Sequence, residues 1–207
     1  MPDTKTFWDR IARKYAANPI KNVEGYNRTV ERTRAHLSRD DRVLEVGCGS
    51  GTTALLLAPH VAHITASDIS SEMTAIGAEK TADQKVTNAE FVCATPFDDA
   101  FPSAPFDAVL AFNFLHLTSD VSATLRRLGD LLKPGGVLIS KTAAIGGAKQ
   151  YLIRPLIAVM QLFGKAPSGL SYFTAKQLEA KMREAGFELV ESDFHGDSRP
   201  FIVARKN

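Results

Sequence analysis

"VLEVGCGSG", residues 43–51, is the stretch that decides the fold of this chain. Its first four residues form a short apolar run, broken by one glutamate, of the kind that buried parallel strands use. The glycines after it predict a tight turn, and the residues that follow have a helical pattern. A glycine string alone is a weak signal, so the strand before it and the helix after it carry the prediction. Because ligands of open parallel sheets bind at the carboxyl ends of strands, we predict a ligand-binding turn here.

Short apolar runs and helical stretches alternate along the rest of the chain. This alternation predicts a Rossmann-like three-layer α/β sandwich with helices on both faces of the sheet. We expect seven strands, mostly parallel, with an antiparallel last strand and the sequence KPGG at 133–136 as the turn that ends a helix. The expected strands are 42–46, 64–67, 91–94, 108–112, 137–140, 187–191 and 200–204. The expected helices are 6–17, 23–37, 52–57, 71–82, 121–132, 150–163 and 175–184.

The length and composition fit one globular domain over residues 1–207, with 44% hydrophobic and 23% charged residues. Within it we expect a helical cap at 1–40 and an inserted segment at 146–172. Lys and Arg number 25 against 23 Asp and Glu, and they are scattered, without the basic stripe that is typical of nucleic-acid binding. The first residues lack the apolar core of a signal peptide, and no apolar run reaches the ~20 residues of a membrane span. We therefore expect a cytoplasmic protein without stable membrane insertion.

Two cysteines and one histidine are not expected to take part in binding or catalysis. Cys48 and Cys93 do not have the spacing of metal ligands, so we expect buried, reduced thiols and no metal site. His195 lies between the last two expected strands, where a turn residue is ordinarily solvated.

Acidic residues around the turn indicate the chemistry of the ligand. The glycines do not follow the dinucleotide pattern G-x-G-x-x-G, because Thr52 stands at its last position. Glu45, on the strand just before the turn, repels a pyrophosphate and suits a ligand with an ammonium group and hydroxyls. Asp68 ends the next strand about 20 residues after the turn, where a carboxylate accepts two ribose hydroxyls. The alternative for Asp68 is a helix N-cap.

The motifs of the chain resemble those of the class I S-adenosylmethionine-dependent methyltransferases, particularly the small-molecule branch. Residues 45–51 match the first motif of that family, in which Glu45 orders the turn. FDAVLAFNFLHL at 106–117 and LLKPGGVLISK at 131–141 look like its fourth-strand and fifth-strand motifs. LEAKMREAGFELVE at 178–191 looks like its late helix and strand. The motifs occur in the order of the family, and the resemblance implies S-adenosylmethionine as cofactor and S-adenosylhomocysteine as product.

The resemblance also implies which residues meet the methionine part of the cofactor. The backbone of the turn at Gly47, Cys48 and Gly49 contacts it. Phe112 and Asn113, at the end of the fourth expected strand, lie near the amine and the sulfonium.

A second set of implied contacts concerns the nucleoside. Asp68 binds the ribose, Ile69 contacts the adenine, and Tyr15 closes over the cofactor from the N-terminal helix. The family commonly has an aspartate after the third strand that binds the adenine amine, but this chain has Ala94 there, followed by Thr95. A backbone contact or the Thr95 hydroxyl is expected to take its place.

His116 is the candidate catalytic base, since it follows the fourth expected strand and an unperturbed histidine transfers protons near neutral pH. The alternative is a histidine that packs or caps a helix in an apolar segment.

Residues 146–172 are the expected substrate lid, because they interrupt the alternation close to the expected site and hold a helix that is apolar nearly all round. We expect Tyr151, Met160 and Tyr172 to bind the substrate, methionine being an adaptable contact. The alternatives are a helix buried against the domain or against the second subunit of a homodimer, and association with a membrane surface.

The sequence favours methyl transfer, by in-line displacement, to a small and apolar or aromatic acceptor. A nucleic-acid (RNA) methyltransferase is one alternative, although base methylases carry an Asn/Asp-Pro-Pro-aromatic motif where this chain has NFLH at 113–116. A non-catalytic S-adenosylmethionine-binding protein is another, since fold does not establish function. The sequence does not name the acceptor.

Overall fold

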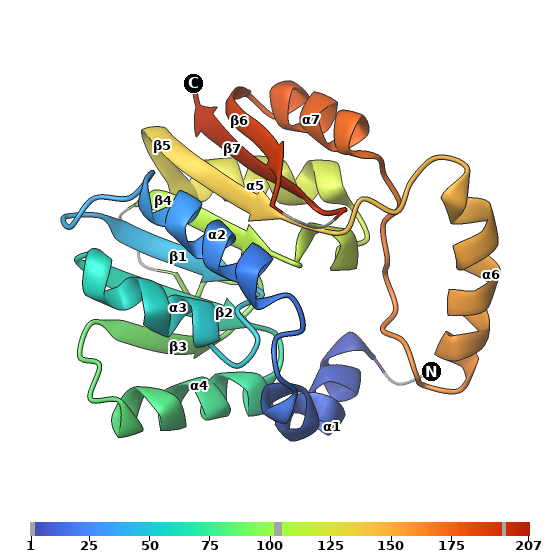
Figure 1. The fold of residues 1–207 in the computed structure, drawn as a ribbon, viewed down its shortest axis with the longest axis horizontal. Coiled ribbons are helices and arrows are strands. Elements are labelled where there is room, and N and C mark those ends of the chain that lie inside the picture. The colour runs from blue at the N-terminus through green and yellow to red at the C-terminus, as the bar shows by residue number, and fades with distance from the viewer. Residues whose placement is uncertain (1–2, 102–104, 196–197) are drawn as a thin grey trace.

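A seven-stranded sheet with helices on both faces forms the centre of the computed structural model, which describes residues 3–101, 105–195 and 198–207 (Figure 1). Its strand order is β3-β2-β1-β4-β5-β7-β6. Strand β7 runs antiparallel to its two neighbours, and the other neighbouring strands are parallel. The predicted α/β fold, with a mostly parallel sheet and an antiparallel last strand, is confirmed.

The elements follow the predicted order. The strands are β1 Arg42–Val46, β2 His63–Asp68, β3 Ala89–Cys93, β4 Phe106–Phe112, β5 Leu132–Lys141, β6 Phe187–Phe194 and β7 Pro200–Lys206. The helices are α1 Thr4–Ala17, α2 Val23–Arg34, α3 Thr52–Leu57, α4 Ser71–Asp83, α5 Val121–Leu131, α6 Lys149–Leu162 and α7 Ala175–Glu184. Two short 3₁₀ helices are η1 Ala58–His60 and η2 Leu115–Leu117.

The sheet is buried on both faces because apolar side chains point to either side of each central strand. On one face, Leu44 of β1 belongs to a core that includes Leu125 of α5 and Leu178 of α7. On the other face, Val43 of β1 belongs to a core that includes Leu57 of α3. This packing fixes the carboxyl ends of the parallel strands at one edge of the molecule.

Helix α1 lies at that edge, packed against α4. Ala12 of α1 and the α4 residues Met73 and Ile76 form a small core of their own. The hydroxyl of Ser70, the N-cap residue of α4, accepts a hydrogen bond from the Met73 N–H at 3.1 Å. The N-terminal helix is therefore held beside the ends of the strands (Figure 1).

The predicted turn at the end of α5 is wrong. The KPGG sequence at 133–136 does not end α5 as a turn but lies inside β5, which begins at Leu132. Gly135 has a φ of 76°, and the pairing of β4 with β5 shifts between Phe106 and Ala108. A glycine with positive φ lets a strand bulge without ending it, which explains why the pattern of a helix C-terminus was misleading.

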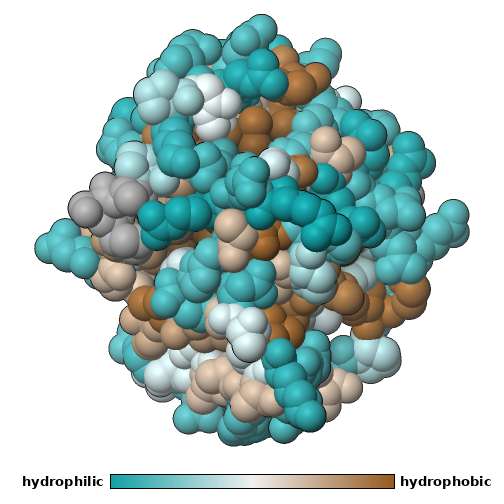
Figure 2. All heavy atoms as spheres, turned by 90° about the vertical axis from the view of Figure 1, so that its left-hand side faces the viewer, coloured by the Kyte–Doolittle hydropathy of each residue, from teal (hydrophilic) through white to brown (hydrophobic). Residues whose placement is uncertain are grey.

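The opposite end of the molecule, where the parallel strands begin, is largely hydrophilic, with apolar residues scattered over it (Figure 2). Among the helices that the structure describes, none has both the length and the apolar character that crossing a bilayer requires.

Candidate functional site

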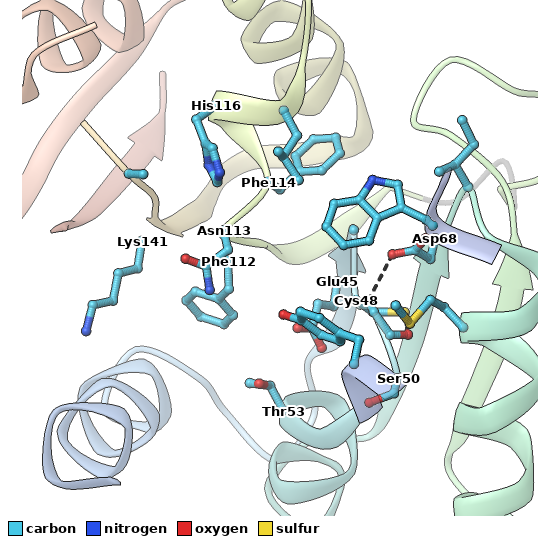
Figure 3. Close-up of a pocket in the computed structure, with 18 of the residues that line it drawn as sticks. Glu45, Cys48, Ser50, Thr53, Asp68, Phe112, Asn113, Phe114, His116 and Lys141 are labelled. Carbon is cyan, nitrogen blue, oxygen red and sulfur yellow. Dashed lines mark hydrogen bonds between the residues drawn. The ribbon is translucent and has the colours of Figure 1, made fainter. Parts of the chain in front are cut away.

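A cavity of about 1060 Å³ lies at the carboxyl ends of β1, β2, β4 and β5, with further walls from α1 and α2 (Figure 3). Glu45, Asp68, Phe112 and Lys141 line it from the four strand ends. Small-molecule sites are commonly ~300–1,000 Å³. The volume is therefore enough for a cofactor and a second small molecule side by side.

The glycine-rich turn forms one wall of the cavity. Gly47 and Gly49 have φ values of 63° and 54°, a conformation that strains any residue with a Cβ atom. A Cβ atom on Gly47 would also lie 2.5 Å from the ring of Phe114. Glycine at these positions lets the backbone of the turn approach a ligand directly.

Asp68 joins the turn to the end of β2. One of its carboxylate oxygens accepts the Gly49 N–H at 2.9 Å, the dashed line in Figure 3, and the other accepts the Ser70 N–H at 2.9 Å. Burial raises the pKa of this carboxyl, and these two hydrogen bonds oppose the rise. A carboxylate has about four acceptor sites, so two remain for a pair of hydroxyls in the cavity.

Glu45 is the most unusual group of the site. Its side chain is 2% exposed and lines the cavity, and its Oε2 atom has no hydrogen-bond partner among the residues that the structure describes. Burial, with a smaller effect from Asp68, raises the pKa of Glu45 to about 8. A buried polar atom without a partner is costly, and an ammonium group in the cavity would supply the partner. Glu45 and Asp68 together thus fit a ligand with an ammonium group and a diol.

The far end of the cavity carries basic groups. Lys141 is 7% exposed, and its ammonium donates a hydrogen bond to the Thr29 hydroxyl at 2.8 Å. The Arg199 guanidinium donates to the Asn113 side-chain oxygen at 3.0 Å. Figure 3 shows Lys141 and Asn113 on the side of the cavity away from Asp68. The cavity is therefore acidic at one end and basic at the other.

His116 faces the cavity from η2 (Figure 3). Its Nδ1 atom lies 2.8 Å from the Thr142 hydroxyl oxygen, which fixes the direction of the ring. Burial, with a smaller effect from Arg199, lowers the pKa of His116 to about 4. The imidazole is consequently neutral at physiological pH and a weak base.

The edge expected to meet adenine is apolar. Ala94 is buried, and its N–H donates to the Asp68 carbonyl at 3.0 Å. The Thr95 hydroxyl donates to Asp98 at 3.0 Å, so its proton is already engaged. Ile69 lines the same part of the cavity, and this leaves backbone and apolar contacts for a purine.

Tyr15 lines the cavity from α1 and is about half exposed. Its ring packs edge to face with Trp8, another lining residue, with centroids 5.9 Å apart. Two aromatic rings of the N-terminal helix thus form a roof over the turn.

The structure brings twelve of the fifteen predicted site residues to this cavity. They are Tyr15, Glu45, Gly47, Cys48, Gly49, Asp68, Ile69, Ala94, Thr95, Phe112, Asn113 and His116.

The three expected substrate contacts do not line the cavity. Tyr151 and Met160 are exposed on α6, and Tyr172 lies under the guanidinium of Arg154, 5.1 Å from ring centroid to charge centre. Of the expected lid, Ser168 and Gly169 do line the cavity. The assignment of the three residues to the substrate stays a prediction.

Sequence reasoning missed Lys141 and misplaced His195. A lysine that ends an apolar strand was the available signal for Lys141. The expectation of a solvated His195 is wrong, because the side chain is fully buried between Thr29 of α2 and the ring of Phe201, 4.3 Å away between centroids. Residue spacing within one segment does not reveal that α2 covers the end of β6.

The cysteine prediction is also wrong in part. Cys48 is half-buried in the turn, but Cys93 is exposed. Cys93 ends β3, which lies at the edge of the sheet and has a neighbouring strand on only one side.

Comparison with known proteins connects this geometry to a family. The family model described as "Methyltransferase domain" matches residues 12–192. The ubiquinone biosynthesis O-methyltransferase of Azorhizobium caulinodans is 29% identical over 204 residues, which cover 89% of this chain and 77% of that protein. The demethylmenaquinone methyltransferase of Listeria monocytogenes is 30% identical over 135 residues, 62% of this chain and 57% of that protein.

Among solved structures, the N-methyltransferase NodS from Bradyrhizobium japonicum WM9, in complex with S-adenosyl-L-homocysteine, has a TM-score of 0.72. The match covers 99% of both chains at 18% sequence identity. At this identity the likeness concerns the fold.

Proposed function

This chain belongs to the class I S-adenosylmethionine-dependent methyltransferases, whose domain model matches residues 12–192, and on that premise we propose that its acceptor is a small, apolar or aromatic molecule. S-adenosylmethionine is the cofactor and S-adenosylhomocysteine the product.

Two carboxyl groups lie at one end of the cavity, and for this reason we assign that end to the cofactor. Glu45 offers the cofactor ammonium a buried oxygen that has no partner among the described residues, and Asp68 offers two acceptor sites to the ribose diol. The backbone at Gly47–Gly49 then holds the methionine chain. Ile69 and Ala94 pack against the purine, and the backbone beside them binds its polar edge.

When bound, the cofactor supplies a methyl group activated for in-line displacement, so the contribution of the protein is orientation and exclusion of water. Tyr15 and Trp8 cover the cofactor end from α1. Phe112 and Phe114 line the middle of the cavity and Asn113 borders the basic end, which supports a flat apolar acceptor between the two ends.

Two relatives support the aromatic class of the acceptor. One is named for ubiquinone biosynthesis and the other for demethylmenaquinone, and each name refers to a quinone. An acceptor with a ring and one ionisable hydroxyl fits a cavity with an apolar middle and a basic end.

We assign His116 to the contact with the reacting group of the acceptor. Thr142 orients its ring, and the neutral imidazole can accept a hydrogen bond from an acceptor hydroxyl. Its low pKa makes it a weak base, so it orients the hydroxyl and takes up a proton only late in the transfer. The segment 146–172 borders the cavity through Ser168 and Gly169, and we assign it to the rim through which the acceptor enters.

A transfer assay tests the proposal. The protein is incubated with methyl-labelled S-adenosylmethionine and a panel of apolar phenols and quinols, with charged amines and short RNA as contrasts. We expect label in at least one apolar aromatic compound, and a 10-fold or larger loss of kcat in His116→Ala, about the effect of one lost hydrogen bond to a reacting group. His60→Ala removes a histidine that does not line the cavity and serves as the matched control. Transfer only to RNA or to charged amines would contradict the proposed acceptor class.

A further inference from the structure

Helix α6 is apolar along most of its length and packs only loosely on the rest of the described chain. In Figure 1 it stands beside the body of the protein, joined to it by two extended connections. No residue from 150 to 162 is buried, although most of them are apolar. Leu152 is 81% exposed and Phe163, which caps the helix, is 73% exposed. Soluble monomers rarely leave such a continuous apolar surface in water, so this one indicates a binding partner.

The exposed apolar residues form an ordered surface. Leu152, Leu156, Val159 and Phe163 are spaced by four, three and four residues, and this spacing places them in one row along the helix. We call this row, with its neighbours Tyr151 and Leu162, the α6 apolar row. All six side chains are exposed.

The α6 segment is attached to the body at its two ends. At its start, Gly146 packs so closely on Phe173 that a Cβ atom would lie 2.3 Å from the Phe173 carbonyl carbon. After the helix, the Arg10 guanidinium donates to the Gly164 carbonyl, and the Ser168 hydroxyl is 2.8 Å from that of Thr4. These attachments hold the α6 apolar row outward beside the rim of the cavity, to which Ser168 belongs.

The helix is also poorly stabilised by its own sequence. It has no side-chain N-cap, and Pro155 removes one hydrogen bond from its interior. Helices of ~12–15 residues without tertiary packing are marginal in water. Contact with a partner is therefore expected to stabilise the helix.

The charge around α6 identifies the kind of partner. Residues 146–173, which include α6, contain no Asp or Glu and three Lys and Arg residues. Arg154 on α6 and Lys165 just after it are exposed. By helical spacing, Arg154 lies on the face of α6 opposite the α6 apolar row, where its guanidinium stacks on the Tyr172 ring. A helix with one apolar face, a basic group on the other face and no acidic residue is complementary to an anionic lipid surface.

A second copy of this chain fits the same surface less well. Residues 146–173 of each copy contain three basic and no acidic residues, so pairing through α6 would bring two segments of like charge together.

We propose that α6 docks the protein on the surface of an anionic lipid bilayer, with the α6 apolar row inserted among the lipids and Arg154 and Lys165 at the headgroups. This orientation places the rim of the cavity at Ser168 and Gly169 next to the bilayer. An apolar molecule dissolved in the lipid then has a short path into the cavity.

Sedimentation with lipid vesicles tests the proposal on the full chain. Vesicles of phosphatidylcholine with 30% phosphatidylglycerol are compared with vesicles of phosphatidylcholine alone, for the wild type, Leu156→Glu and Leu56→Glu. Leu56 is an exposed leucine on α3, so its variant makes the same chemical change away from α6. We expect the wild type and Leu56→Glu to bind the anionic vesicles and Leu156→Glu to bind at least ~10-fold more weakly, because burying one leucine side chain contributes about a tenfold effect or more.

Hydrogen exchange provides the second measurement. We expect fast amide exchange over 150–162 in buffer, and slower exchange there when anionic vesicles are added. Unchanged S-adenosylhomocysteine affinity in the Leu156→Glu variant shows that its fold is intact. The proposal is overturned if the wild type ignores anionic vesicles, if Leu156→Glu binds them as well as Leu56→Glu does, or if the wild type is a dimer in solution that Leu156→Glu converts to a monomer.

Discussion

Replacing Glu45 by glutamine tests whether cofactor binding releases a proton from the Glu45 carboxyl group. In the free protein, burial holds the pKa of Glu45 at about 8, so the carboxyl is about 90% protonated at pH 7 and about 50% protonated at pH 8. An ammonium group bound at its unpartnered oxygen favours the ionised form, and the proton leaves to solvent. Glutamine has the same shape but no proton to lose.

The magnitude follows from these fractions. Compared with Glu45→Gln, the wild type should release about 0.9 more protons per S-adenosylhomocysteine bound at pH 7, and about 0.5 more at pH 8. The ionised fraction of Glu45 rises from about 0.1 to about 0.5 over the same interval. The affinity of the wild type relative to the variant should therefore rise about fivefold.

Titration calorimetry in two buffers with different ionisation enthalpies measures the protons directly. The ligand ammonium titrates in both proteins, so its contribution cancels in the difference between them. Equal proton release from the wild type and the variant at pH 7 would refute the reasoning, since it would mean that Glu45 is already ionised or does not meet the ammonium.

Three more predictions concern the turn and its neighbours. Between pH 4.5 and about 8, Glu45 is protonated in the folded protein and ionised in the unfolded chain. The contribution of this group to the free energy of unfolding should therefore fall by about 1.4 kcal/mol per pH unit in the wild type. Glu45→Gln removes this loss, so it should raise the Tm of the cofactor-free protein more at pH 8 than at pH 5. Gly51 has a φ of 75°, and a Cβ atom there would lie 2.2 Å from the Phe91 ring. Gly51→Ala should therefore lower the free energy of unfolding, measured in urea, by roughly 2 kcal/mol or more, and a change of less than about 0.5 kcal/mol would contradict this strain. Since the pKa of His116 is about 4, the histidine is neutral throughout pH 5.5–8. The pH profile of kcat/KM should therefore have no inflection near pH 6.5 that is present in the wild type and absent in His116→Ala.

The sequence was sufficient to predict the sheet and the cofactor end of the cavity, because both depend on local signals. The strand–turn–helix pattern around Gly47 and the acidic residue at the end of the next strand are encoded within about 25 residues. Each such unit places its ligand contacts at the carboxyl edge of a parallel sheet.

The acceptor end depends on packing between distant segments and was less accessible to prediction. Lys141 reaches Thr29 of α2, and His195 is buried under the same helix, although more than 100 residues separate them from α2 in the sequence. The apolar composition of α6 was visible, but its position outside the core was not, because an apolar helix pattern is the same for a buried helix and an exposed one.

Binding of S-adenosylhomocysteine to the wild type and to Asp68→Ala, measured by calorimetry, tests the central claim most directly. Asp130→Ala, which removes an exposed carboxylate on α5, is the matched control, and melting curves establish that all three proteins are folded. The account predicts micromolar binding to the wild type and to Asp130→Ala, with binding to Asp68→Ala weaker by about 10-fold or more, the effect of one charge-assisted hydrogen bond. A folded wild type that does not bind, or an Asp68→Ala variant that binds as tightly as the wild type, would contradict the placement of the cofactor at Gly47–Gly49 and Asp68.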